Sequence, residues 1–394
     1  MAGLVTLVIA GMASLFMAWA IGAGSSGSTP FAPAVGANAL SVMRAGFLVG
    51  ILGFLGAALQ GANVSEAVGR ELIIGVQLSP LAATTGLLTA AILVAVGVFT
   101  GYPIATAFTV TGAIVGVGLA LGGDPAWAKY QQIVALWVLT PFVGGGVAYA
   151  TARTLRHEDV PEGVAIPLLG GVVGLIVANV GFVFLGPPGA SASIAGATAS
   201  AFSSPRIAGV DSGAVLASLA LAGGVTLALR RELAVNDTRG QRRFLLALGG
   251  LVAFSAGGSQ VGLAIGPLLP LLDDFTIPLV AVLVGGGLGL LAGSWTGAPR
   301  MIKALAQDYS ALGPRRSIAA LIPAFAIAQA AVFFGIPVSF NEIIVSTIIG
   351  SGYAASGGGV SGRKMGYTVL AWVLSLALAL GVGYGVFTAV QSIL

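Results

Sequence analysis

The sequence predicts an all-α integral membrane protein with about twelve transmembrane segments, arranged as two inverted-topology repeats with broken helices at the midplane. Three observations support this prediction: the composition, the spacing of apolar runs, and similar tracts in the two halves. Apolar residues make up 57% of the 394 residues and charged residues only 8%, and the mean hydropathy is +1.02. A water-soluble domain of this size cannot hide so much apolar surface, so a lipid bilayer must be its solvent.

Twelve apolar runs are long enough, or nearly long enough, to cross a bilayer, which takes about 20 residues of helix. Two of the twelve are short. Their connections are polar, and the most basic one is RRELAVNDTRGQRR at 230–243. The expected segments cover residues 3–22, 43–62, 79–100, 104–122, 129–152, 163–186, 211–229, 244–266, 276–297, 317–335, 338–352 and 366–388.

The distribution of Lys and Arg gives these segments a direction. When 230–243 is placed in the cytoplasm and the segments alternate, the inside holds 14 basic side chains and the outside 3. This bias is typical of a correctly threaded membrane protein, and it predicts that both termini are extracytoplasmic. We expect a multi-pass protein of a prokaryotic plasma membrane. The outer segment 187–210 is rich in Gly, Ala, Ser and Pro, which favours a flexible loop.

Similar tracts recur in the two halves in the same order. GYPIATAFTVTGAIVG at 101–116 matches GIPVSFNEIIVSTIIG at 335–350, with Pro103 and Pro337 separated by 234 positions. A segment with a tryptophan follows each tract. Upstream, AWAIGAGSSGS at 18–28 matches AFSAGGSQVGL at 253–263 at almost the same separation. These matches predict an internal repeat.

Each repeat would contain five segments, an odd number, so the two repeats would have opposite orientations. The predicted organisation is repeat 1 over 1–152, repeat 2 over 241–394, and two linking segments over 153–240, with the outer loop 187–210 and the basic loop 230–243. Secondary transporters with inverted repeats bind substrate near the midplane, where broken helices meet. The Gly/Ser tracts and the short Pro-led helices would expose backbone N–H groups that favour anions. The alternative is that the tracts only permit close helix packing.

The chain resembles the inorganic phosphate transporter family, part of a superfamily of phosphate and sulfate permeases, over nearly its whole length. That family carries a GANDVAN tract and a PVSTTH tract in each half. Its second GANDVAN is commonly followed by AIGPL, and this chain has AIGPLLP at 264–270. Its PVSTTH is commonly followed by a run such as AIVGAIVG, and this chain has TVTGAIVG at 109–116. The resemblance implies a transporter that moves inorganic phosphate with a coupling ion.

The chain departs from the family pattern at several positions. Ser25 and Gln260 stand where the family has Asp, and the second PVSTTH reads PVSFNE, with Glu342 at the His position. The first PVSTTH reads PIATAF, which keeps Thr106 and has Phe108 at the His position. A hard cation binds more weakly without carboxylates, so we expect a proton rather than sodium as the coupling ion, with no other cofactor and no metal site.

The predicted substrate-binding residues are neutral hydrogen-bonding groups in the four tracts, which can hold an oxyanion without adding charge. They are Ser25, Ser26, Ser28, Thr29, Thr106, Ser259, Gln260, Ser339 and Asn341.

Glu342 is the most deeply placed acid in the expected segments, and ionisable groups inside a bilayer are costly enough to suggest a function. In the functional interpretation, Glu342 gains and loses a proton that moves with the anion. In a second interpretation it stays protonated and only ties helices together. In a third it faces water at a helix start, because Pro337 marks a break five residues earlier.

Other functions stay open. A sulfate or related oxyanion permease would need much the same donors, and a passive anion or solute channel would explain the missing cation ligands. An enzyme is disfavoured, because the chain has no Cys and one His, and it shows no paired acids or metal-ligand spacing. The expected partners are phosphate or sulfate and membrane lipid, not nucleic acid, and the resemblance suggests a homodimer.

Overall fold

The computed structural model describes residues 2–187, 191–202, 204–207, 209–273, 275, 277–307, 309–354 and 362–393. Ten of the described helical segments are long and apolar enough to cross a membrane, and two shorter helices lie among them. Each of the twelve expected segments thus contains a helix, and ten of these helices are long enough to span a membrane. That the two short helices cross the membrane stays a prediction. The long ones are α1 (Ala2–Ile21) with the π-helical turn η1 (Gly22–Ser26), α3 (Val42–Gln60), α5 (Pro80–Thr100), α7 (Trp127–Thr154), α8 (Glu162–Asn179), α10 (Ser212–Val235), α11 (Asp237–Ile265) with η3 (Gly266–Leu268) and α12 (Leu269–Leu272), α13 (Leu279–Thr296), α15 (Pro314–Phe334) and α17 (Gly362–Ile393).

The two shorter helices are α6 (Thr106–Ala120) and α16 (Phe340–Tyr353), and both are almost wholly buried. Each follows an extended stretch that contains a proline, because proline and the residue before it disfavour helix. The remaining short elements connect the long helices. They are α2 (Ala32–Gly36), α4 (Ala62–Arg70), α9 (Ile194–Ala201), α14 (Ala298–Gln307), the 3₁₀ turn η2 (Val183–Leu185), and the antiparallel pairs β1–β2 (Ile73–Ile74, Asp124–Pro125), β3–β4 (Gly181–Phe182, Ala192–Ser193) and β5–β6 (Arg206–Ile207, Val210–Asp211).

The two halves of the chain interlock through matching close approaches of helix backbones. A Cβ on Gly116 of α6 would lie 2.2 Å from the carbonyl oxygen of Leu380 in α17, and a Cβ on Gly350 of α16 would lie 2.0 Å from that of Gly145 in α7. Only glycine fits at such crossings, which are typical of helix packing in lipid. Each short helix thus packs against a long helix from the other half. The contacts recur as a repeat requires, and the opposite orientation of the repeats stays a prediction.

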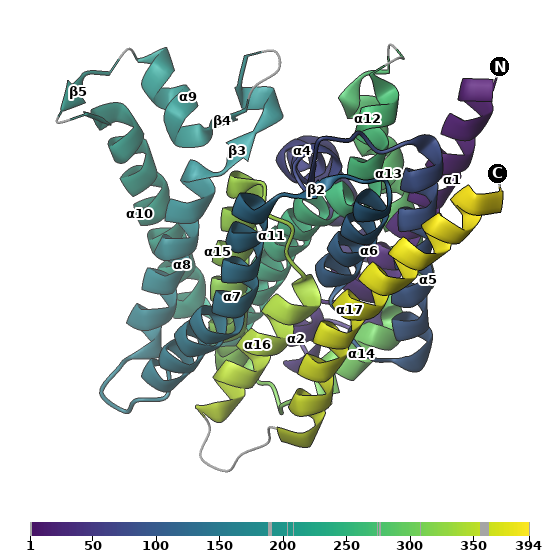
Figure 1. The fold of residues 1–394 in the computed structure, drawn as a ribbon. Helices are drawn as coiled ribbons and strands as arrows, with labels where there is room; N and C mark the ends of the chain where they lie inside the picture. Colours follow the sequence, from purple (N-terminus) through teal and green to yellow (C-terminus); the bar gives the residue numbers. More distant parts are fainter. Residues whose placement is uncertain are drawn as a thin grey trace.

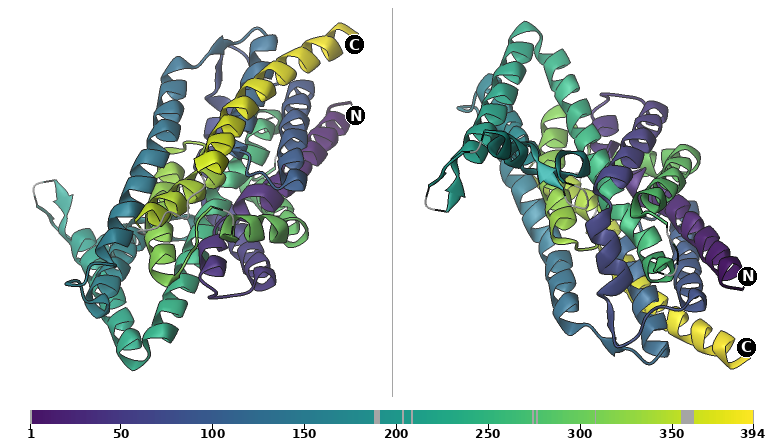
Figure 2. Two further views of the ribbon diagram at one scale, coloured as in Figure 1. Left: turned by 90° about the horizontal axis from the view of Figure 1, so that it is seen from below. Right: turned by 90° about the horizontal axis from the view of Figure 1, so that it is seen from above.

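Close approaches of helix backbones from the two halves also occur between η1 and α13 and between α3 and α11. A Cβ on Gly22 would lie 2.1 Å from the carbonyl oxygen of Leu290, and a Cβ on Gly257 would lie 1.8 Å from that of Gly53. Figures 1 and 2 show the result, a bundle in which the two chain ends lie near one another, with α8, α9 and α10 on one flank.

Three expectations about irregular segments differ from the structure. The tract GGSQVG at 257–262 is helical, because α11 continues to Ile265, whereas the first tract does break the helix. The first tract is followed by Pro30 and Pro33, and the second has no proline before Pro267, so helix can continue through it. The predicted basic loop 230–243 is almost entirely helical, and the chain turns only at Asn236, whose side chain caps α11.

The third difference concerns segment 187–210, which we expected to be a flexible loop. Among its described residues it contains the helix α9, and the Ser193 side chain caps that helix by accepting from the backbone N–H of Gly196. Asp211 then caps α10. The hydroxyl of Ser204 donates to the Asp211 carboxylate at 2.5 Å and holds the pKa of Asp211 below its ordinary value.

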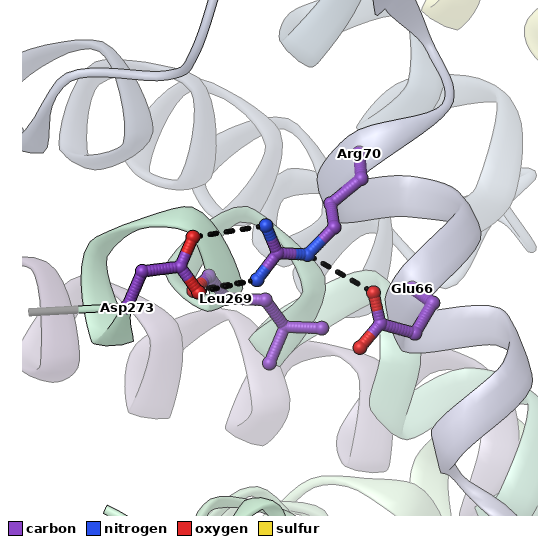
Figure 3. A network of polar contacts seen from close by, with 4 residues as sticks. All are labelled: Glu66, Arg70, Leu269 and Asp273. Atoms are coloured by element: carbon purple, nitrogen blue, oxygen red, sulfur yellow. Dashed lines mark hydrogen bonds and ion pairs between the residues drawn. The ribbon is translucent and has the colours of Figure 1, made fainter. Parts of the chain in front are cut away.

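An ion-pair network joins the two halves at the bundle end near the chain termini (Figure 3). The guanidinium of Arg70 in α4 binds both carboxylate oxygens of Asp273, at 2.7 and 3.0 Å, just after α12. Its Nε lies 3.0 Å from the carboxylate of Glu66 one turn earlier in α4. The hydrogen bond and the charge of Arg70 lower the pKa of Asp273, and Asp273 in turn raises the pKa of Arg70.

Candidate substrate-binding site

The first Gly/Ser tract folds on itself around the carbonyl of Ser25. That oxygen accepts from the backbone N–H of Ser28 and Thr29, each at 3.0 Å, and from their hydroxyls at 3.2 and 3.0 Å. Gly27 permits the turn, because a Cβ there would lie 2.0 Å from the carbonyl oxygen of Gly22. Ser28 and Thr29 therefore use their hydroxyl protons to hold the break in the helix. Ser26 is buried beside them.

Ser25, Thr106 and Gln260 form a hydrogen-bonded triangle among three elements distant in sequence. The amide oxygen of Gln260 in α11 accepts from the hydroxyl of Thr106 at 2.8 Å and from that of Ser25 at 3.2 Å, and the two hydroxyl oxygens lie 3.3 Å apart. The amide nitrogen of Gln260 donates to the carbonyl of Val338 at 2.5 Å. All three side chains are fully buried. One glutamine thus ties the first tract, the start of α6 and the approach to α16 together.

Asn341 makes a second link at the start of α16. Its amide nitrogen donates to the carbonyl of Gly24 at 2.9 Å and to that of Ile104 at 2.7 Å. Two carbonyl acceptors fix the orientation of the amide, since only the NH₂ end can donate to them. The other end, Oδ1, is buried and has no partner among the described residues. Asn341 therefore presents a fixed acceptor.

Four predicted site residues carry a buried polar atom without a hydrogen-bond partner among the described residues. An unsatisfied buried polar group typically costs about 1 to 3 kcal/mol, so such atoms gather where binding requires them. In the described residues, only Thr111 and Ser310 share this property outside the predicted set. The four atoms are Ser259 Oγ, Ser339 Oγ, Asn341 Oδ1 and Glu342 Oε2.

Glu342 lies in the first turn of α16 and is only 2% exposed. This burial contradicts the interpretation in which Glu342 faces water. In the part of the chain that the structure describes, no Lys or Arg forms an ion pair with it. A helix N-terminus favours negative charge through its exposed N–H groups. Within the described residues, no three His, Cys, Asp or Glu side chains cluster as metal ligands would.

Two tryptophans that we used only as markers of the repeat prove to position the site. The indole N–H of Trp137 in α7 donates to the carbonyl of Pro337 at 2.9 Å, and that of Trp372 in α17 donates to the carbonyl of Pro103 at 2.8 Å. The Trp137 ring also stacks on Phe108, with ring centres 3.8 Å apart. The signal for this role is the place of each tryptophan in the segment after a Pro-led tract.

A further buried network escaped the sequence analysis. Gln329 in α15 donates to the hydroxyl of Ser255 at 2.6 Å and lies 3.4 Å from the amide oxygen of Gln60, and Gln60 donates to the carbonyl of Gly181 at 2.9 Å. The sequence signal that could have predicted this network is a glutamine, Gln329, inside the apolar run of α15. This network joins α3, α11 and α15 and does not reach the Gln260 triangle.

The chain is similar to known and candidate phosphate transporters over most of its length. The model of the phosphate transporter family matches residues 21–383. An inorganic phosphate transporter of Arabidopsis thaliana chloroplasts is 25% identical over 92% of this chain and 68% of its own length. A candidate phosphate permease of Pyrococcus abyssi is 26% identical over 95% of each chain, and one of Thermococcus kodakarensis is 23% identical over 92% of each.

The fold also matches a solved structure, that of a sodium-dependent phosphate transporter. The TM-score is 0.82 at 22% identity, and the match covers 99% of this chain and 100% of the other. The all-α membrane fold expected from the sequence is thereby confirmed. The family match, in turn, confirms the prediction of a transporter rather than an enzyme. A family match across nearly the whole chain leaves one conclusion: this protein is a member of the phosphate transporter family.

Proposed function

We propose that the chain is a permease that carries inorganic phosphate across the membrane together with protons, and that Glu342 carries the proton. The family supports phosphate as the substrate class. The observation that carries the proposal is that two consecutive residues each hold a buried oxygen without a hydrogen-bond partner among the described residues, Asn341 Oδ1 and Glu342 Oε2. No other acid stands among the predicted site residues.

The fixed acceptor on Asn341 favours phosphate over sulfate. Phosphate is partly protonated near neutral pH, so it has an O–H group that can donate to Asn341 Oδ1. Sulfate is fully deprotonated and has only acceptor oxygens, which would face this atom without a proton between them. The hydroxyls of Ser259 and Ser339 can donate to the remaining oxygens of either anion. Phosphate can therefore satisfy both kinds of group in this site.

A proton fits the coupling role better than sodium does. Ser25 and Gln260 are neutral, and the oxygen of Gln260 already accepts from two hydroxyls. Sodium would have to replace these hydrogen bonds without a carboxylate at either position. Glu342 needs only to bind and release one proton, and its Oε2 has no hydrogen-bond partner among the described residues.

The test is uptake of labelled phosphate into vesicles that contain the purified protein. Wild type should accumulate phosphate against its gradient when the lumen is more alkaline than the outside, and replacement of sodium by choline should not change this. Glu342→Gln should lose accumulation but still equilibrate phosphate. Glu158→Gln, which alters an exposed acid, should behave as wild type.

Four results would count against parts of the proposal. Accumulation by Glu342→Gln at the wild-type level would refute the proton role of Glu342. A strict need for sodium would show that sodium, and not a proton, is the coupling ion. Phosphate that only equilibrates in the wild type would indicate a passive channel. Competition by sulfate as strong as that by phosphate would refute the assigned preference.

A further inference from the structure

An apolar groove runs along one side of α7, between this helix, α16 and α17. Its volume is about 720 Å³. On α7 the groove follows residues 141–149, about 12 Å of helix rise, and its lining is mainly apolar. Lining residues include Phe142, Gly146, Tyr149, Ile349, Met365 and Trp372.

A second apolar groove, of about 450 Å³, runs along the other side of α7, between α7 and α8. Its lining includes Thr151, Leu155, Val164, Leu168 and Val172. On α7 the first groove ends at Tyr149 and the second begins at Ala150. The two grooves therefore follow one another along the C-terminal half of α7, on different faces of the helix.

The two grooves meet at a polar pocket of about 570 Å³ around the end of α7. This pocket shares Tyr149 with the first groove and shares Ala150, Thr154 and Val160 with the second. Besides the hydroxyls of Tyr149 and Thr154, its polar side chains are those of Arg153, His157 and Asp159. The combined shape is one polar pocket with two apolar arms.

The charges around this pocket are mainly positive. Arg153 is exposed, donates to the hydroxyl of Tyr149 at 2.9 Å, and forms no ion pair with any described residue. Arg156 and Arg363 are exposed at the same end of the bundle, and Arg156 donates to the carbonyl of Ala354 at 2.8 Å. The acids are Glu158, which is exposed, and Asp159, whose carboxylate lies 3.5 Å from His157. The bias of basic residues assigns this end to the cytoplasm.

We propose that this pocket and its two grooves bind one anionic phospholipid with two acyl chains. The phosphate of the headgroup lies against Arg153, one chain follows the groove beside α16 and α17, and the other follows the groove beside α8. A single polar pocket with two apolar arms fits a diacyl lipid, and the positive charge fits an anionic headgroup at a cytoplasmic surface. None of the predicted substrate-binding residues, nor Glu342, lines the pocket or its grooves, and lipid binding is measured without transport, so the two proposals fail independently.

Native mass spectrometry of the purified protein tests the proposal, with phosphatidylglycerol and phosphatidylcholine of identical chains as the probes. One phosphatidylglycerol should bind in preference to phosphatidylcholine. Arg153→Gln should weaken that binding about fivefold, as expected for one basic side chain near an anionic lipid, and Arg153→Lys should restore most of it. Gly146→Leu should weaken binding of both lipids about tenfold by filling the groove.

The variants have matched controls. A Cβ on Gly146 or on Gly385 meets no atom within 4 Å, so both accept a side chain without a clash. Gly385→Leu on the exposed face of α17 and Arg231→Gln at the end of α10 should bind phosphatidylglycerol as wild type does. Equal binding of the two lipids, wild-type binding by Arg153→Gln or Gly146→Leu, or equal losses in the controls would each overturn the proposal.

Discussion

Trp137 and Pro337 lie 200 residues apart in the chain, yet the indole of the first donates to the carbonyl of the second at 2.9 Å in a buried setting. Trp372 and Pro103 form the mirror of this contact at 2.8 Å. Each half thus supplies the tryptophan that holds the helix break of the other half. Because both breaks lead directly into predicted site residues, these two hydrogen bonds couple the interlocked fold to the position of the site.

Replacing either tryptophan by phenylalanine should lower both stability and uptake. Trp137→Phe keeps an aromatic ring against Phe108 but leaves the carbonyl of Pro337 without its donor, which costs about 1 to 3 kcal/mol for a buried group. We expect a lower maximal rate of phosphate uptake with a smaller change in KM, because the binding groups themselves are kept. Trp372→Phe should show the same pattern.

The matched control for this pair is Trp127→Phe. Trp127 is 67% exposed at the start of α7 and lies edge-on to Tyr130. Uptake and thermal stability of this variant should equal those of wild type. If all three variants behave alike, the two indole hydrogen bonds do not position the breaks.

The glycines at the two crossings should tolerate no side chain. The new methyl group would lie 2.2 Å from a backbone carbonyl oxygen in Gly116→Ala and 2.0 Å from one in Gly350→Ala. Backbone cannot move aside as a flexible side chain can, so the loss of stability should exceed about 3 kcal/mol. Size-exclusion profiles and thermal unfolding would measure it. Gly381→Ala, where a Cβ meets nothing within 4 Å, should leave the profile unchanged.

Much of the fold follows from local sequence, because apolar runs of bilayer length mark the helices directly. The two Pro-led tracts likewise mark α6 and α16. The second Gly/Ser tract shows the limit of this reasoning: glycines near Gly257 could break a helix or bring two helices together. The backbone of α3 lies against them in the fold, and no local pattern contains that information.

The site, too, could be predicted only in part. The fold brings Ser25, Thr106 and Gln260 into one hydrogen-bonded group, and all three stand at positions that the tracts indicated. Sequence spacing could not tell which hydroxyls face the group and which hold the turn, as Ser28 and Thr29 do. Those roles depend on hydrogen-bond directions set by tertiary contacts.

The ion pair between Arg70 and Asp273 should make stability depend on pH in the acid range. Arg70 holds the pKa of Asp273 below its ordinary value, near 4 for a free aspartate. The stabilisation is therefore complete above about pH 4 and disappears as the pH falls through the lower pKa of the folded protein. The effect should be small, because the pair is partly exposed and screened by salt.

Thermal unfolding of wild type and Asp273→Asn at several pH values would measure this contribution. The difference between the two proteins should be largest at neutral pH and low salt, and should shrink on acidification. Asp124→Asn alters an exposed acid that forms no ion pair with any described residue, and this variant should follow wild type. A difference that grows as the pH falls would contradict the assigned sign.

Asn341→Asp should abolish uptake, although it only replaces the side-chain NH₂ group by an oxygen. The amide nitrogen of Asn341 donates to two carbonyls, and a carboxylate would place an acceptor against both. Two lost hydrogen bonds and the repulsion should cost roughly 2 to 4 kcal/mol and disturb the starts of α6 and α16 together. Asn179→Asp is a matched control, since Asn179 also donates twice, to Leu175 and Ser218, but is exposed in α8. It should keep wild-type uptake, and equal losses in both variants would show that Asn341 has no special place in the site.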